Sequence, residues 1–133
     1  MIEVKNLSGS RIEQKSLLKA TQKVLTGEKS KLDVSIVLMQ PKEIQLLNRQ
    51  YRNKNYPTDV LSFRYEESGE VVLCVQEIKK DAMATGTILK KQVVLVLIHG
   101  VLHLLGYDHE KSRKEAEKME KKQNYYLKKL RFN

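Results

Sequence analysis

The sequence predicts an α+β fold in which one mixed β-sheet packs with about five helices. The first observation is the order of its patterns, which read strand, helix, strand, helix, hairpin and then helices only. The second is size, because 133 residues with a hydrophobic content of 41% suffice for one core but would be cramped as two domains. We therefore expect a single domain over residues 1–133. The order of the strands cannot be read from these patterns.

The N-terminal part predicts a strand, a helix and a second strand. Residues 1–7 alternate apolar and polar side chains, as a half-buried strand does. Ser10 and Glu13 have the spacing of a capping box, so we expect a helix to begin there and to stop at Gly27. Residues 32–39 carry apolar side chains on both faces, which indicates a more central strand.

The middle of the chain predicts a helix followed by a β-hairpin. Pro41 is suited to the first turn of a helix, which we expect to end within residues 53–57. Residues 59–65 and 71–75 have the composition of strands. Ser68-Gly69 lies between these strands and marks the expected turn of the hairpin.

Three helices are expected in the rest of the chain. Residues 76–85 form a short one. Residues 93–98 are apolar on every side, and propensity alone would make them a strand. We assign them to a buried helix, because the spacing of the histidines and of the leucines up to Leu105 is helical. Ser112 and Glu115 form a second capping box and predict the start of an amphipathic last helix.

The composition bounds the class of protein. Lysine and arginine number 25 against 16 acidic residues, and the net charge of +9 attracts polyanions such as nucleic acid. A lysine-rich solvated surface explains the same charge, which therefore supports an RNA partner without establishing one. The apolar run is too short to span a membrane and the N-terminus lacks a signal pattern, so we expect a soluble, cytoplasmic protein without membrane contact. The single Cys74 is expected to be a buried thiol.

All three histidines lie within eleven residues, at positions 99–109. In a helix, His99 and His103 share one face, where two imidazoles can bind one metal ion. Gly106 can take the positive φ that ends a helix, and the chain then returns His109 towards the pair. Three imidazole nitrogens leave a fourth position open, as a catalytic zinc site requires. We expect one metal ion per chain at the end of the buried helix, either Zn²⁺ or another divalent transition metal such as Ni²⁺.

The residues beside the histidines raise two alternatives. Asp108 either orients a ligand histidine through a hydrogen bond or only caps the turn. Zinc proteases carry glutamate directly after their first histidine as the catalytic base, and here that position is Gly100. A metal-dependent peptidase or other hydrolase of small molecules is therefore the less favoured alternative.

A second group of basic and aromatic residues precedes the hairpin. Arg52 offers a planar fork for two phosphate oxygens, Lys54 a point charge, and Tyr51 or Tyr56 a face on which a base can stack. The alternative is structural, with Arg52 near a helix C-terminus where it compensates the dipole, and with the tyrosines packed. The chemistry of these residues favours neither interpretation, so RNA binding by Arg52, Lys54 and Tyr56 is a hypothesis.

Both groups fall within longer motifs. Residues 99–109 match the pattern HGxLHLxGYDH, and residues 51–63 match Y-R-x-K-x-x-P-T-[DN]-V-L-S-F. Together they resemble the two signatures of the YbeY family of bacterial ribosomal-RNA maturation factors, and the resemblance implies a similar α+β arrangement. Arg64 departs from the proline that is common in the family, and Glu70 departs from its frequent aspartate. Both departures fall in the hairpin.

The resemblance also implies an activity. It assigns metal binding, usually of zinc, to His99, His103 and His109, and the functional arginine of the family to Arg52. The implied protein is a single-strand-specific endoribonuclease that processes the 3′ end of small-subunit rRNA and serves ribosome quality control, with the small subunit and assembly factors as partners. A non-catalytic, metal-stabilised assembly or RNA-binding factor is the alternative. Attack by water and attack by the RNA 2′-hydroxyl are both open.

Overall fold

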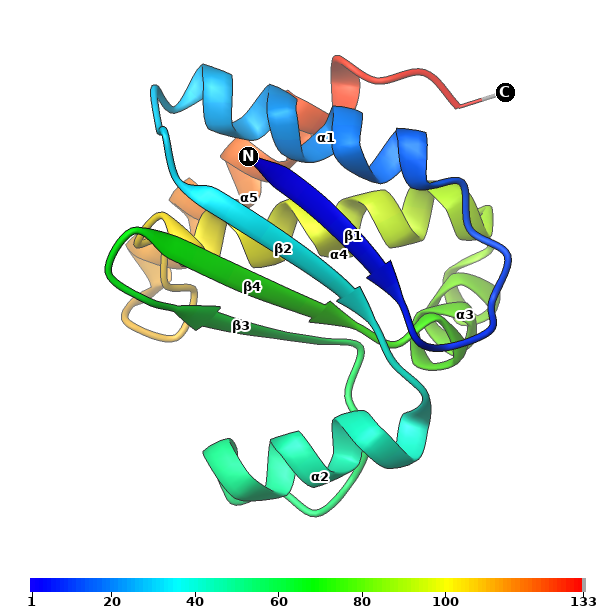
Figure 1. Cartoon of the computed structure of the whole chain (residues 1–133). Helices are drawn as coiled ribbons and strands as arrows, with labels where there is room; N and C mark the ends of the chain where they lie inside the picture. The colour runs from blue at the N-terminus through cyan, green and yellow to red at the C-terminus, as the bar shows by residue number, and fades with distance from the viewer. Residues whose placement is uncertain (133) are drawn as a thin grey trace.

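Strand-like stretches of the sequence form one four-stranded sheet, and helices cover both of its faces (Figure 1). The computed structural model describes residues 1–132, which contain four strands and five helices. In chain order the elements are β1 (Ile2–Asn6), α1 (Gln14–Gly27), β2 (Asp33–Leu38), α2 (Pro41–Arg52), β3 (Val60–Arg64), β4 (Ser68–Leu73), α3 (Val75–Thr85), α4 (Leu89–Leu104) and α5 (Arg113–Lys128).

The sheet is mixed, as predicted. Its strand order is β1-β2-β4-β3, with β1, β2 and β4 parallel and β3 antiparallel to β4 at one edge. Strand β2 pairs on both sides, so that Ile36 lies opposite Val4 of β1 and Val71 of β4. Ile36 and Val71 have no exposed surface. The apolar character of both faces of β2 thus follows from its place inside the sheet.

Two apolar clusters hold the layers together. The larger lies on the sheet face that α1, α3, α4 and α5 cover (Figure 1). The smaller joins the other face to α2 through Ile44 and includes the buried thiol of Cys74, as expected. Within residues 1–132, no single helix is long and apolar enough to cross a membrane, and α3 and α4 meet that test only as a pair bent by 115°.

Helix α4 runs through the larger cluster. Nine of its 16 residues are buried, among them Leu97, Ile98 and Leu102 without any exposed surface. Burial of such a side chain stabilises the fold by about 1.5–3 kcal/mol. Because these gains add along the helix, packing outweighs the strand propensity of the β-branched run. The prediction of a buried helix is confirmed.

The capping box predicted at Ser10 and Glu13 is wrong. Helix α1 begins at Gln14 with Glu13 as its N-cap, and no side chain caps it. The backbone N–H of Ser10 donates to Ser8 Oγ at 3.0 Å, and the Ser10 carbonyl accepts from Asn6 Nδ2 at 2.7 Å. These short polar side chains bond to nearby backbone and hold Ser10 in the turn before the helix.

The predicted turn of the hairpin is also misplaced. Ser68-Gly69 lies within β4, and residues 65–67 connect the two strands. A Cβ atom on Gly69 would come within 2.7 Å of the Leu104 side chain. Gly69 therefore permits close packing of α4 on the sheet. This tertiary contact explains the glycine, and the local sequence does not show it.

Candidate metal centre and cleft

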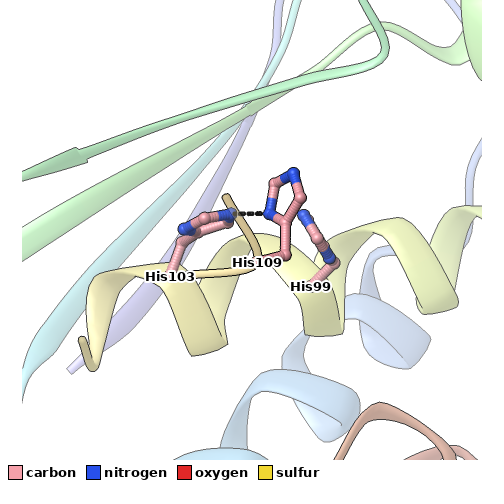
Figure 2. Close-up of side chains that lie close together, drawn as sticks. All are labelled: His99, His103 and His109. Atoms are coloured by element: carbon pink, nitrogen blue, oxygen red, sulfur yellow. Dashed lines mark hydrogen bonds between the residues drawn. The ribbon is translucent and has the colours of Figure 1, made fainter. Parts of the chain in front are cut away.

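Two histidines of α4 and one from the following turn come together (Figure 2). His99 and His103 are one helical turn apart, and their ring centroids are separated by 4.8 Å. Beyond the helix, Gly106 has a φ of +100°, which reverses the chain. The ring of His109 is thereby brought to a centroid distance of 5.0 Å from each of the other two rings.

The three rings offer nitrogen atoms at metal-binding spacing. One nitrogen from each ring lies within 4.8 Å of the others, and His103 Nε2 is 3.0 Å from His109 Nδ1. Nitrogens that share one tetrahedral zinc ion at about 2.1 Å lie roughly 3.4 Å apart, so this set suits a single small ion. Within residues 1–132 it is the one group of three or more potential ligand side chains that meets this spacing. The structure thus brings the predicted ligands together.

Helix α5 contributes a further residue to the site. Gln123 Oε1 accepts a hydrogen bond from His99 Nδ1 at 2.5 Å, which leaves Nε2 of His99 free to bind a metal ion. Burial lowers the pKa of His99, against the opposing effect of Gln123. Burial also lowers the pKa of His103, and the neighbouring rings of His99 and His109 lower it further. Both imidazoles are therefore favoured in the neutral form that metal binding requires.

Asp108 supports the turn that carries His109. Its Oδ1 accepts a hydrogen bond from the backbone N–H of Glu110 at 2.9 Å. A carboxylate that bonds to backbone two residues further along is the usual way in which aspartate stabilises a turn. Asp108 therefore caps this turn. The hydrogen bond that orients a histidine comes instead from Gln123, which contacts His99.

The same turn is tied to two helices through the carboxylate of Glu28, at the end of α1. The Tyr107 hydroxyl donates to Glu28 Oε1 at 2.6 Å, and Lys122 Nζ donates to Oε2 at 3.1 Å. Tyr126 also donates to Oε2. Partial burial acts to raise the pKa of Glu28, but these three hydrogen bonds outweigh it and lower the pKa. Burial and the carboxylate together raise the pKa of Tyr107 to about 12.

Gly100 lets α4 approach the strands on the other side of the site. A Cβ atom on Gly100 would lie 2.8 Å from the Val71 side chain and 3.1 Å from Ser62 Oγ. The Ser62 hydroxyl donates to the Gly100 carbonyl at 2.9 Å. A glutamate at this position would meet the packed sheet, so the base of the zinc proteases has no room here.

The histidines line one side of a cleft of about 610 Å³. The rest of its lining comes from the end of α2, from β3, from their connection, from the end of α4 and from the turn after α4. These residues are Tyr51, Arg52, Thr58, Asp59, Val60, Leu61, Ser62, Phe63, Arg64, Leu104 and Glu110. Arg52 Nη2 lies 3.5 Å from Glu110 Oε1, and the same oxygen lies 3.9 Å from His109 Nε2. One carboxylate thus links Arg52 to the histidine cluster.

Comparison with known proteins identifies the family. The family model described as Endoribonuclease YbeY matches residues 3–131. The chain belongs to the YbeY family. An Endoribonuclease YbeY of Persephonella marina is 40% identical over 125 residues, which cover 86% of this chain and 82% of the relative. One of Petrotoga mobilis is 38% identical over 125 residues, covering 90% and 87%.

A solved structure agrees with the family assignment. The solution structure of TM1509 from Thermotoga maritima is similar with a TM-score of 0.69 and 33% sequence identity, covering 96% of this chain and 87% of that one. The resemblance to the YbeY family and the mixed α+β fold are both confirmed.

The departure from the YbeY pattern at Arg64 has a structural consequence. Arg64 Nη1 donates to the carbonyl of Leu104 at 2.8 Å, and Nε donates to the carbonyl of Tyr65 at 2.8 Å. Leu104 is the last residue of α4, where backbone carbonyls lack helical partners. In this member of the YbeY family, the arginine therefore ties the hairpin to the end of the helix that carries His103.

The RNA-binding residues predicted beside Arg52 lie in different places. Tyr51 lines the cleft and packs edge-on against Phe63, with ring centroids 5.0 Å apart. Lys54 and Tyr56 are exposed and do not line the cleft. Of the two tyrosines that the sequence offered as stacking partners, the structure therefore places Tyr51 beside the site.

Sequence reasoning missed three side chains at the site. Glu110 follows His109 directly, and this adjacency was an available signal. Asp59, at the start of the expected strand 59–65, lines the cleft, where burial raises its pKa and the charge of Asp81 raises it further. Gln123 had no local signal, because its contact with His99 depends on how α5 packs against α4.

Proposed function

We propose that this chain is a metal-dependent endoribonuclease that cleaves single-stranded RNA. The observation that carries the proposal is a shared cleft, onto which three convergent imidazoles and the Arg52 guanidinium open together. The names of the YbeY relatives specify an endoribonuclease, which supports RNA as the substrate. Three imidazoles suit one Zn²⁺ ion per chain, and Ni²⁺ binds the same donors.

The residues in and around the cleft have different proposed roles in RNA cleavage. A zinc ion held by His99, His103 and His109 would supply a Lewis acid at the phosphate and a water of lowered pKa. Gln123 keeps the proton of His99 on Nδ1 and so presents the other ring nitrogen. Arg52 binds two oxygens of the scissile phosphate through its planar guanidinium and stabilises the charge that develops on them.

Single-stranded RNA suits this cleft better than a duplex. The Tyr51 side chain is 60% exposed and offers a ring on which an unpaired base can stack. An A-form duplex keeps its bases stacked on one another and cannot present one to such a ring. The net charge of +9 favours association with any RNA strand and makes the binding sensitive to salt.

The cellular role is proposed from the family resemblance. We place the activity in the cytoplasm, in processing of the 3′ end of small-subunit rRNA and in ribosome quality control. The small ribosomal subunit and its assembly factors are the proposed partners. Peptide hydrolysis is disfavoured, because Gly100 is packed against Val71 and Ser62 where a protease would need its glutamate.

The decisive experiment compares two conservative substitutions in the last turn of α2. Arg52→Lys keeps the charge at the helix end but cannot rebuild a bidentate phosphate contact. We expect its cleavage rate on single-stranded RNA to fall on the order of a hundredfold, as for the loss of an oxyanion-hole contact. Arg49→Lys, at an exposed position outside the cleft, is the matched control and should cleave at the wild-type rate.

Metal content and melting temperature are measured on the same preparations. Both should match wild type in Arg52→Lys, whereas His103→Ala should lose the metal and the activity together. Wild-type cleavage by Arg52→Lys would assign Arg52 a structural role. RNA binding without metal-dependent cleavage by highly purified protein would favour the non-catalytic assembly factor instead.

A further inference from the structure

The outer face of α5 carries a basic and aromatic patch that the metal centre does not use. Lys121, Asn124, Tyr125, Lys128 and Lys129 line a surface hollow of about 490 Å³, and all five side chains are exposed. From Lys121 to the end of the chain the sequence contains four lysines and one arginine but no acidic residue. We name these five residues the α5 patch.

The lysines of the α5 patch are not among the basic residues that form ion pairs within residues 1–132. Lys122 is paired with Glu28, Arg113 with Glu117, and Lys80 with Glu77. Within the described part of the chain, no ion pair is formed by the three patch lysines. Their positive charge is therefore available to an external polyanion.

Tyr125 adds a stacking surface to this charge. Its side chain is 52% exposed, although the tyrosine beside it, Tyr126, is buried. The Nζ atom of Lys129 lies 4.6 Å from the centroid of the Tyr125 ring. A flexible lysine over the ring can be replaced by a base, which leaves the ammonium group free to contact phosphate. Exposed aromatic rings among lysines are how proteins bind single strands without sequence preference.

The α5 patch lies across the helix from the metal centre. Gln123 of the same helix contacts His99, whereas Lys121 and Tyr125, two residues to either side, point to the opposite face at 100° per residue. A helix with its side chains is about 10–12 Å thick, so an RNA strand needs a few nucleotides beyond the cleft to reach the patch.

We propose that the α5 patch binds the single-stranded RNA that flanks the scissile phosphate and so anchors longer substrates. The proposal rests on the endoribonuclease function and deepens it, since it adds a second contact for the same substrate. A membrane surface would require an apolar helix face beside the lysines. In α5 the apolar residues Met119 and Tyr126 are buried in the core, so RNA fits the patch better than lipid does.

The test uses the full-length, metal-loaded protein and two labelled single-stranded RNAs, one of about six nucleotides and one of about twenty, in line with known single-strand site sizes. Tyr125→Ala should weaken binding of the long RNA about tenfold, since one base loses its stacking partner. Lys121→Gln/Lys128→Gln should lower the slope of log affinity against log salt by about 1.4 for the long RNA. Cleavage of the short RNA should stay at the wild-type rate in both variants.

The matched control is Lys42→Gln/Lys79→Gln, which removes the same charge at exposed positions of α2 and α3 and should leave the affinity for the long RNA unchanged. Equal weakening by this control would reduce the α5 patch to general surface charge and overturn the proposal. Unchanged affinity for the long RNA in both patch variants would overturn it as well. A wild-type protein that cleaves neither RNA would instead refute the endoribonuclease function itself.

Discussion

Replacement of Gln123 by leucine tests whether α5 controls the metal centre. The Gln123 amide oxygen accepts the proton of His99 Nδ1 at 2.5 Å and so selects the tautomer whose Nε2 can bind metal. Leucine has a similar size but offers no acceptor. Without this partner, His99 can rotate and can place its proton on either nitrogen, so that part of the binding energy is spent on ordering the ring.

The expected loss follows from a single hydrogen bond to one of three ligands. Loss of such an outer partner weakens metal affinity about 10–100-fold, which corresponds to roughly 1.4–2.7 kcal/mol. Gln123→Glu keeps an acceptor and adds charge, so it should hold zinc at least as tightly as wild type. We would measure zinc affinity by competition with a chromophoric chelator at pH 7.5.

Asn124→Leu is the control, because it makes the same amide-to-leucine change at the next position, which is exposed and does not contact His99. Its zinc affinity should equal that of wild type. Wild-type zinc affinity in Gln123→Leu would show that the hydrogen bond to His99 is not needed for metal binding, and would refute the reasoning.

Three further substitutions test the framework of the site. Gly100→Ala forces a Cβ atom to within 2.8 Å of Val71 and should lower the free energy of unfolding in urea by about 1–2 kcal/mol. Glu110→Gln removes the anion that competes with phosphate for Arg52, and should raise RNA affinity up to about fivefold in fluorescence anisotropy. Glu28 has a lowered pKa, so its contribution to stability is complete above about pH 4.5 and is lost as the pH falls through the lower pKa of the folded state. Glu28→Gln should therefore reduce the loss of stability at acidic pH, measured as the free energy of unfolding against pH.

For each of these three substitutions, one result would contradict the prediction. Undiminished stability in Gly100→Ala would mean that the strands retreat from α4 at no cost. Weaker RNA binding by Glu110→Gln would show that its carboxylate helps to orient the cleft and does not compete with the substrate. An unchanged acid limb in Glu28→Gln would assign the loss of stability in acid to other carboxyl groups.

Two predictions from the sequence failed at residues that suit more than one local conformation. Ser10 and Glu13 have the right spacing for a capping box. Asn6 and Ser8 nevertheless form hydrogen bonds with the backbone of Ser10, and α1 begins only at Gln14. Ser68-Gly69 has the composition of a turn, yet it lies in β4. Short polar residues and glycines suit several local conformations equally well, so the hydrogen bonds or the packing around them decide which one forms.

Local sequence patterns predict most of the helices and strands and the three clustered histidines of this protein. The period of an α-helix places His99 and His103 on one face, and Gly106 permits the turn that returns His109, so covalent spacing alone brings the three rings close. The family motifs, too, are properties of the sequence, and they include Arg52.

The surroundings of the three histidines depend on tertiary contacts. The strand order, the contact of Gln123 with His99, and the approach of the Glu110 carboxylate to Arg52 depend on parts of the chain that are distant in sequence. Such contacts depend on how separate helices and strands pack, and a one-residue change of register or a rotation of α5 would remove them without altering any local pattern. Local spacing therefore explains the histidine cluster, whereas the chemical environment of the cluster results from packing.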